Sequence, residues 1–295
     1  MLEDFESRTV TTEGAEIFLK TGGSGPPLLM LHGYPQTHIT WRLVAPLLAE
    51  HFTLVLPDLR GYGQSRGPAP DAENQHYSKR TMAADMVTVM LALGHERFLL
   101  AGHDRGGRVA YRLCLDHPER VSAFAAIDVA PTIAVWEGMN AEAALDAWHW
   151  PFLAQPAAVA EPVIAAATEA VIGSFLRGWA GKPDGLTPEA IAAYLAQFED
   201  PAVIAGTCAD YRAGATIDWR HDAEDRAKGR RIACPILAHW GSLYLGEAEP
   251  TPVTNWKAWA DEVTGGPFPC GHFLQEELPE VLAEALIPFF LANRP

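Results

Sequence analysis

The sequence has few cysteines, a deficit of basic residues and no long hydrophobic run, and each shortage excludes a class of protein. Its four cysteines form neither a C-x-x-C pair nor a Cys/His cluster, which argues against a zinc site and a disulfide framework. Lys and Arg number 22 against 37 Asp and Glu, so the formal net charge is −15 over 295 residues. Such a surface repels nucleic acid and anionic membranes.

Membrane insertion and export are also not expected. The apolar stretches are far shorter than the ~18 residues that a transmembrane helix requires. The first residues are acidic, where a secretory signal would be basic and then apolar. We therefore expect a soluble cytoplasmic protein with buried, reduced thiols, no metal and no other cofactor.

Short apolar runs alternate along the chain with helical patterns, which is typical of an α/β fold with a mostly parallel central sheet flanked by helices. The candidate strands are residues 28–31, 52–56, 98–101, 124–127 and 236–240. Ser78 is suited to cap a helix that stops at Gly94. Thr187 and Pro188 predict the start of another helix.

The pattern changes between Pro131 and Arg230, where helices rich in Ala and Trp follow one another without a convincing strand. Strand patterns resume only at Ile236. We therefore expect a core domain formed by residues 1–130 and 231–295. Residues 131–230 are expected to form a helical lid, or cap domain, inserted between two strands of the same sheet.

The sharpest local signal is Gly102-His-Asp-Arg-Gly106, which directly follows a candidate strand and precedes a plausible helix. This pattern predicts a nucleophile elbow, whose small flanking residues permit a strained turn that lifts the central side chain above the sheet. The central residue is Asp104 rather than the serine of an esterase. A carboxylate that attacks a saturated carbon forms an alkyl-enzyme ester that water can cleave. The residue type therefore favours alkyl substitution over acyl transfer.

A carboxylate nucleophile needs a histidine that activates water and an acid that holds this histidine. His272 lies in a Gly-His-Phe turn between the last strand region and the closing helix, which is where hydrolases of this chain order carry the base. Asp128 directly follows a candidate strand, whereas the rival position after residues 236–240 offers no acid. We therefore expect Asp128 to be the acid.

His32-Gly-Tyr-Pro35 follows the candidate strand 28–31, the position from which hydrolases supply one N–H group of the oxyanion hole. The backbone N–H groups of Tyr34 and Arg105 are the predicted donors to the oxyanion that forms when the ester is cleaved.

Five segments together resemble the fluoroacetate dehalogenases (haloacetate dehalogenases) of the α/β-hydrolase superfamily. They are His32-Gly-Tyr-Pro-Gln36, Gly102-His-Asp-Arg-Gly-Gly-Arg108, His149-Trp150, Asp210-Tyr-Arg-Ala-Gly214 and Gly271-His-Phe-Leu274, and they extend over nearly the whole chain. The resemblance implies an α/β-hydrolase fold and hydrolytic dehalogenation of a short 2-haloacid, with fluoroacetate preferred. It also implies a small-molecule haloacid as the only ligand and a homodimer as the assembly.

The resemblance implies catalytic and binding roles as well. Asp104 is expected to be the nucleophile, His272 the base that activates water, and Asp128 its orienting acid. Arg105 and Arg108 are expected to bind the substrate carboxylate.

The same resemblance assigns the departing halide to His149, Trp150 and Tyr211. Pro151 disfavours helical geometry at Trp150, so we expect the His-Trp pair at a helix end. Tyr34 stands where the family often has Phe and is expected to shape the pocket. Trp179 is a candidate for an additional pocket wall.

Simple electrostatics supports the two arginines independently. A substrate carboxylate about 4 Å from Asp104 would cost roughly 4 kcal/mol at an effective dielectric constant near 20. Arg105 and Arg108, three positions apart at the predicted helix start, can bring two guanidinium groups to one anion and offset that cost.

Two other functions stay open at this point. An epoxide hydrolase uses the same Asp-His-Asp set but polarises the epoxide oxygen with lid hydroxyls, for which Tyr211 and Tyr194 are candidates. A neutral epoxide has no need of the arginine pair, which separates the two enzymes. A ligand-sensing relative without turnover is disfavoured because nucleophile, base and acid are all retained. The loop 243–252 matches the family weakly and is left unassigned.

Overall fold

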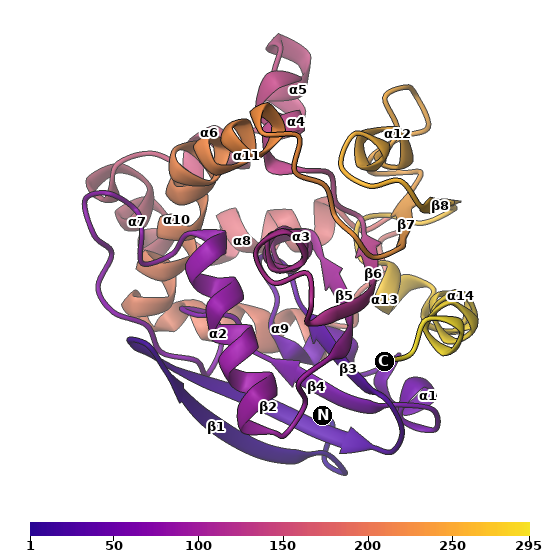
Figure 1. Cartoon of the computed structure of the whole chain (residues 1–295). Helices are drawn as coiled ribbons and strands as arrows, with labels where there is room; N and C mark the ends of the chain where they lie inside the picture. Colours follow the sequence, from indigo (N-terminus) through magenta and orange to yellow (C-terminus); the bar gives the residue numbers. More distant parts are fainter.

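One eight-stranded sheet runs through the computed structural model, which describes residues 1–295 (Figure 1). Its strand order is β1-β2-β4-β3-β5-β6-β7-β8. The strands are β1 (Glu6–Thr12), β2 (Ala15–Gly23), β3 (Pro27–Leu31), β4 (Thr53–Pro57), β5 (Phe98–His103), β6 (Val121–Ile127), β7 (Ile236–Gly241) and β8 (Val263–Phe268). β2 pairs antiparallel with both β1 and β4, and every other pairing is parallel. The expected α/β class with a mostly parallel sheet is confirmed.

Helices follow or connect most of the strands. Those outside the β6–β7 connection are η1 (His38–Trp41), α1 (Ala45–Ala49), α2 (Lys79–Ala92), α3 (Asp104–Asp116), α12 (Pro252–Lys257), α13 (Leu274–Glu277) and α14 (Pro279–Ala292). Those between β6 and β7 are α4 (Thr132–Glu137), α5 (Ala141–Asp146), α6 (His149–Leu153), α7 (Ala157–Ala166), α8 (Thr168–Gly178), α9 (Pro188–Ala196), η2 (Gln197–Glu199), α10 (Pro201–Ala215) and α11 (Ile217–Ala227).

Both faces of the sheet are covered, which explains why its central strands are apolar throughout. In β3, Leu29 and Leu31 join a cluster that contains residues of α2 and α3, whereas Leu28 and Met30 join a second cluster with α1 and α14. This division follows from the alternation of side chains along a strand. α2 and α3 lie on one side of the sheet, and α1 and α14 lie on the other (Figure 1).

The regular elements between β6 and β7 are all helices, and we call this stretch the inserted helical segment. Its residues continue the cluster on the α2–α3 side, so it shares a core with the sheet. α4, α5, α6 and α11 of this segment lie along the top of the molecule in Figure 1. No single helix is long and apolar enough to cross a membrane; only α7 and α8 together, bent by 87° to each other, reach that length and composition.

The helix caps expected from the sequence are present. The side chain of Ser78 accepts a hydrogen bond from the N–H of Thr81 at the start of α2. Gly94, directly after this helix, has a φ of 85° that favours glycine. The side chain of Thr187 accepts from the N–H of Ala190 and begins α9.

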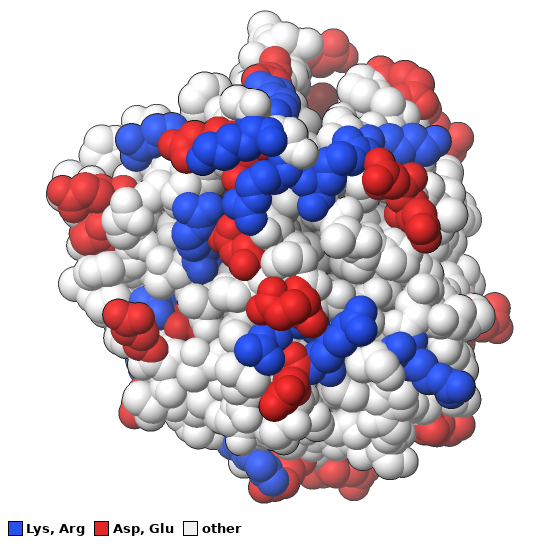
Figure 2. Space-filling model, in the orientation of Figure 1, with Lys and Arg blue, Asp and Glu red and all other residues white.

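Charge on the visible surface is mixed. Figure 2 shows a band of Lys and Arg where α11 lies in Figure 1, with Asp and Glu among them. Basic residues of α11 and the following turn that take part in ion pairs are Arg226, Lys228, Arg230 and Arg231. Carboxylates therefore offset much of the positive charge of this band.

Candidate active site

A cavity of about 280 Å³ lies at the carboxyl ends of the central strands. Asp104, which follows β5, and Asp128, which follows β6, both line it, together with His272 from the turn before α13. Ligands of open parallel sheets bind at this edge, where the chain leaves the strands. The three residues predicted as nucleophile, acid and base therefore meet in one cavity.

Asp104 occupies a strained turn between β5 and α3. Its φ of 47° lies in the left-handed region, which non-glycine residues rarely adopt. The turn needs small neighbours, because a Cβ added at Gly106 would collide with the carbonyl oxygens of Leu31 and His32. The sequence forms the expected nucleophile elbow because glycine is present where α3 passes β3.

The carboxylate of Asp104 is buried and oriented by backbone. The N–H of Tyr34 donates to its Oδ1 at 2.8 Å, and Oδ2 makes no hydrogen bond within the chain. Burial raises the pKa of Asp104, but His272 and the guanidinium groups of Arg108 and Arg105 outweigh this effect and lower the pKa overall. The carboxylate is therefore ionised, with one oxygen free.

His272 is held by Asp128 on one side and is free on the other. Its Nδ1 contacts Oδ2 of Asp128, and the N–H of Gly241 donates to Oδ1 of Asp128 at 2.7 Å. Burial raises the pKa of Asp128, with His272 opposing part of this effect. Nε2 of His272 is buried and has no partner in the chain. This nitrogen can accept a proton from a water molecule in the cavity.

The backbone around His272 is fixed by groups outside the triad. The N–H groups of Gly271 and Phe273 donate to the carboxylate of Glu277 at 3.1 and 3.2 Å, and the N–H of His272 donates to the carbonyl of Trp179 at 2.8 Å. His103 packs against the His272 ring at 4.5 Å between centroids, and burial lowers the pKa of His103 to about 3. The His272 backbone is therefore held rigidly, and the imidazole that packs against its ring is neutral.

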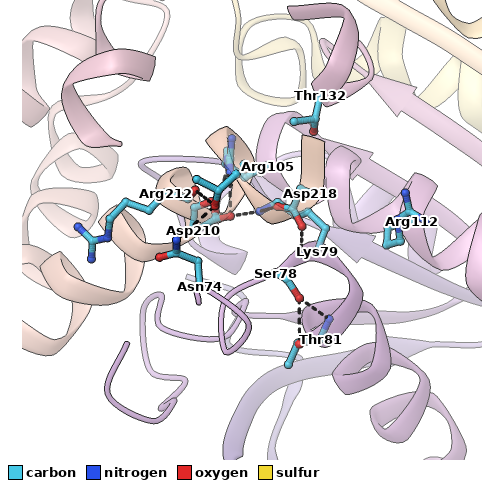
Figure 3. Close-up of polar contacts among 12 residues, drawn as sticks. Asn74, Ser78, Lys79, Thr81, Arg105, Arg112, Thr132, Asp210, Arg212 and Asp218 are labelled. Atoms are coloured by element: carbon cyan, nitrogen blue, oxygen red, sulfur yellow. Dashed lines mark hydrogen bonds and ion pairs between the residues drawn. The ribbon is translucent and has the colours of Figure 1, made fainter. Parts of the chain in front are cut away.

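Arg105 and Arg108, at the start of α3, are both buried but differ in their surroundings. Arg108 lines the cavity; its Nη1 donates to the carbonyl of Ala130 at 2.6 Å, while its Nε has no partner. Arg105 is not among the cavity-lining residues. Its Nε and Nη2 donate to the carboxylate of Asp210 at 3.0 and 2.8 Å, and its Nη1 has no partner (Figure 3). Neither arginine points to bulk solvent.

His149, Trp150 and Tyr211 are brought together as a group. The ring centroids of His149 and Trp150 lie 6.0 and 5.9 Å from that of Tyr211. Burial lowers the pKa of His149 to about 3, so its imidazole is neutral, and its Nδ1 has no partner. The hydroxyl of Tyr211 makes no hydrogen bond within the chain.

One local expectation about this group is wrong. Trp150 has helical geometry despite Pro151, because α6 begins at His149 and the proline falls in its first turn. Proline is tolerated there, where the missing N–H has no helical acceptor. The His-Trp pair is nevertheless at a helix end, as expected.

Tyr34 and Trp179, which the sequence predicts at the pocket, lie behind the residues that line the cavity. Tyr34 is fully buried, and its ring packs edge-on against Tyr211 at 5.2 Å, while its hydroxyl has no partner. Trp179 lies 4.6 Å from His149 and 5.4 Å from His272 between ring centroids. Neither residue lines the cavity itself: Trp179 packs behind two residues that do, and the ring of Tyr34 packs behind Trp179 and Tyr211.

Other cavity residues were missed from the sequence. Tyr244 and Leu245, from the unassigned loop after β7, line the cavity, and the ring of Tyr244 lies 4.5 Å from that of His272. Asp146 of α5 also lines it. The position of Tyr244 just after a central strand is the one sequence signal that pointed to it.

Two smaller expectations need correction. Tyr194 is not available as a second lid hydroxyl, because it is fully buried and donates to Oε1 of Glu276 at 2.6 Å. Three of the cysteines are buried as expected, but Cys234 is half-buried, and its sulfur lies 4.0 Å from that of Cys114.

Comparison with known proteins places this arrangement in a family. The α/β hydrolase fold family matches residues 26–277, which include the elbow, the acid and the histidine. The chain belongs to this family. The hydrolase is also 42% identical to a fluoroacetate dehalogenase from Burkholderia sp over 98% of this chain and 95% of that protein, which confirms the resemblance noted in its motifs.

Two further relatives extend the comparison. A soluble epoxide hydrolase from Corynebacterium sp. (strain C12) is 33% identical to this hydrolase over 95% of this chain and 96% of that protein. The solved structure of ALR0039 from Nostoc sp PCC 7120 is 46% identical, with a TM-score of 0.95 over 98% of this chain and 99% of that chain. The hydrolase is thus similar along its full length to enzymes named for two different substrates.

Proposed function

We propose that this hydrolase releases halide from short 2-haloacids through an alkyl ester on Asp104, with fluoroacetate converted to glycolate. The observation that carries the proposal is the carboxylate at the elbow, ionised and with Oδ2 unpartnered, in a cavity that Arg108 also lines. The repulsion between an anionic nucleophile and a substrate of the same charge must be offset, and a cavity-lining guanidinium group does this.

The first step is in-line attack by Oδ2 of Asp104 on the carbon that bears the halogen. The new C–O bond forms as the carbon–halogen bond breaks, and the halide departs with the bonding electrons. Tyr34 N–H holds Oδ1 and leaves Oδ2 as the attacking oxygen. Positioning of this kind supplies a large part of the rate of a displacement.

The second step is hydrolysis of the ester. Nε2 of His272, which has no partner in the chain, takes a proton from water, and the resulting hydroxide attacks Cγ of Asp104. Negative charge then develops on Oδ1, which already accepts from the N–H of Tyr34. The N–H of Arg105 lies in the first turn of α3, where it has no helical acceptor, and is the second candidate donor. The bond between Cγ and Oδ2 then breaks, and the 2-hydroxyacid leaves with this oxygen, which takes the proton from Nε2 of His272.

The remaining assignments concern the two ends of the substrate. We assign its carboxylate to Arg108 and to the free Nη1 of Arg105. We assign the departing halide to His149, Trp150 and Tyr211. Fluoride is small and strongly hydrated, so its release requires donors that replace water. A neutral His149 can supply an N–H to the halide without offering an acidic proton to the carboxylate of Asp104.

The inserted helical segment is the proposed lid, with residues 131–230 as the cap domain and residues 1–130 and 231–295 as the core. It supplies His149 and Trp150 to the cavity, whereas the core supplies Asp104, Asp128 and His272. This division separates halide binding from the covalent chemistry.

The proposal is tested by halide release from fluoroacetate and chloroacetate. Asp104→Asn removes the nucleophilic charge and retains the shape of the side chain, so release should fall by at least about 10⁴-fold. The wild-type protein and Asp261→Asn, which changes an exposed surface carboxylate outside the cavity, serve as controls. Undiminished release by Asp104→Asn would overturn the assignment.

A second variant tests the covalent intermediate. His272→Asn should stop the second step but not the first, so the alkyl ester should accumulate on the peptide that contains Asp104. Mass spectrometry of the digested protein after incubation with chloroacetate detects it. If that peptide gains no mass while halide release has stopped, the two-step scheme is wrong.

Epoxide hydrolysis is the second candidate function. It is favoured by the 33% identical epoxide hydrolase and by two hydroxyls near the triad, on Tyr211 and Tyr244, that make no hydrogen bond in the chain. A neutral epoxide gains nothing from Arg108. Comparable turnover of styrene oxide and chloroacetate by one preparation would therefore count against the haloacid assignment.

A further inference from the structure

A buried charge cluster lies directly behind the nucleophile elbow and outside the cavity. It consists of Lys79, Arg105, Asp210 and Asp218, whose side chains are at most 3% exposed (Figure 3). Lys79 begins α2 and Arg105 lies in α3, whereas the two carboxylates come from α10 and α11 of the inserted helical segment. The cluster therefore joins the sheet side of the fold to the segment proposed as the lid.

The contacts form one chain of alternating charge. Asp210 accepts from Nε and Nη2 of Arg105 and also contacts Nζ of Lys79. Lys79 Nζ lies 3.5 Å from Oδ2 of Asp218. The hydroxyl of Tyr62 donates to Oδ2 of Asp210 at 2.6 Å. Two cations and two carboxylates thus balance one another.

This arrangement limits what Arg105 offers to a ligand. Its Nη2 also donates to the backbone carbonyl of Asp210 at 2.9 Å, so every donor except those on Nη1 is occupied. Tyr211 packs under the guanidinium at 4.1 Å and fixes its plane. The direction of the free Nη1 is therefore set by α10.

The charge of Arg105 can attract an anionic ligand only while another cation neutralises the carboxylate of Asp210. Burial, with Arg105 acting in the same direction, lowers the pKa of Lys79 well below its usual value, and the adjacent carboxylate of Asp218 opposes only part of this effect. Direct contact with Asp210 also favours the charged amine. In a site this dry, one uncompensated charge has a large effect on a nearby anion.

We infer that Lys79 and Asp218 are specificity-determining residues, which set the affinity for a carboxylate ligand by controlling how much of the Arg105 charge Asp210 cancels. The inference rests on the proposed function for the choice of a carboxylate as the ligand. Neither residue lines the cavity. Their effect is electrostatic and is transmitted through Asp210.

Variants of these two residues should act in opposite directions. Lys79→Met keeps the length of the side chain but leaves the cluster with a net negative charge, so acetate should bind about threefold to tenfold more weakly. Asp218→Asn leaves it with a net positive charge and should strengthen binding by a similar factor. Asn retains the oxygen that accepts from the N–H of Lys79 at 2.8 Å, so the start of α2 is preserved.

The experiment measures the dissociation constant of acetate through tryptophan fluorescence, because Trp150 lines the cavity. Acetamide is the neutral ligand and should show no such pattern. Arg226→Met removes the same charge as Lys79→Met from an exposed ion pair with Glu137 and should leave acetate binding unchanged. The double variant Lys79→Met/Asp218→Asn restores neutrality and should bind acetate nearly as the wild type does.

A purely structural cluster gives a different result. Both single variants would then weaken binding of acetate, and the double variant would be the weakest, which overturns the inference. If Lys79→Met does not fold, Asp218→Asn decides alone: tighter binding supports the inference, and unchanged or weaker binding overturns it.

Failure of wild-type halide release would overturn the proposed function, whereas the acetate titrations would still decide this inference. Wild-type protein that does not bind acetate overturns it directly.

Discussion

The arginines of α3 show how much the surroundings of a single side chain matter. Arg105 and Arg108 are three positions apart, and the sequence treats them as an equivalent pair. In the structure only Arg108 lines the cavity, and only Arg105 is paired with a carboxylate. We therefore expect Arg108 to supply most of the net positive charge that a haloacid meets.

Substitution of Arg108 should reveal this charge. A hydrogen bond to a charged group contributes about 1.5–3 kcal/mol. Arg108→Met should therefore raise KM for chloroacetate by about 10- to 100-fold, with a smaller effect on kcat. Steady-state kinetics with chloroacetate and the neutral chloroacetamide measures the difference. Equal losses for both substrates would mean that the arginine supports the fold rather than the anion.

The meeting of Asp104, Asp128 and His272 was predictable because each of these residues is marked locally. Asp104 lies between glycines after an apolar run, Asp128 follows another apolar run, and His272 lies in a short turn near the last helix. Their meeting follows from the common edge at which parallel strands end. Asp146 and Tyr244 could not be found in this way, because their place in the cavity depends on how a helix and a loop pack in three dimensions.

At the scale of secondary structure, the elbow depends on how closely α3 approaches β3. A Cβ at Gly106 would collide with two backbone carbonyl oxygens, which cannot move as a flexible side chain can. Gly106→Ala should therefore lower the free energy of unfolding by at least about 2 kcal/mol and reduce activity with it. Urea unfolding followed by circular dichroism measures the change.

Gly178 provides the matched control for that substitution. It is exposed at the end of α8, and a Cβ there would meet no atom within 4 Å. Gly178→Ala should be neutral or stabilising by up to about 1 kcal/mol, because alanine reduces the freedom of the unfolded chain. Similar destabilisation by the two variants would contradict the close approach at Gly106.

The strands divide into those that the sequence predicts and those that it does not. β3 to β7 are largely apolar because helices cover both of their faces, so their runs are conspicuous. β1 is mostly exposed, and β8 contains two glycines and a proline. Both are edge strands, where weak strand propensity is tolerated. Their existence is decided by pairing with a neighbour and not by their own residues.

At the scale of the whole molecule, the net charge of −15 opposes the approach of an anionic substrate. Salt screens such repulsion beyond about 8 Å at physiological ionic strength. Groups within the cavity therefore decide binding once the substrate has arrived. The buried ionic groups behind the elbow matter more for this reason than the larger number of charges on the surface.

Acid should destabilise the whole fold through its buried histidines. The pKa of both His103 and His149 is lowered to about 3 by burial, whereas an unfolded histidine titrates near pH 6.5. Both groups are neutral in the folded and unfolded states above that pH, so the full stability is present there. As the pH falls from about 6.5 towards 3, only the unfolded state takes up protons. Each histidine then reduces the free energy of unfolding by up to ~1.4 kcal/mol per pH unit.

A variant isolates the contribution of one of these groups. His103→Gln retains a donor for the carbonyl of His272, which Nε2 of His103 contacts at 2.8 Å, but it has no titrating ring. Urea unfolding between pH 6 and pH 4 should therefore show a slope shallower than the wild type by about one proton, whatever the absolute stability of the variant. His51 is exposed, so His51→Gln should leave the slope unchanged. If His103→Gln and the wild type lose stability in parallel, His103 already carries a proton in the folded protein. The ring that packs against His272 is then charged and not neutral.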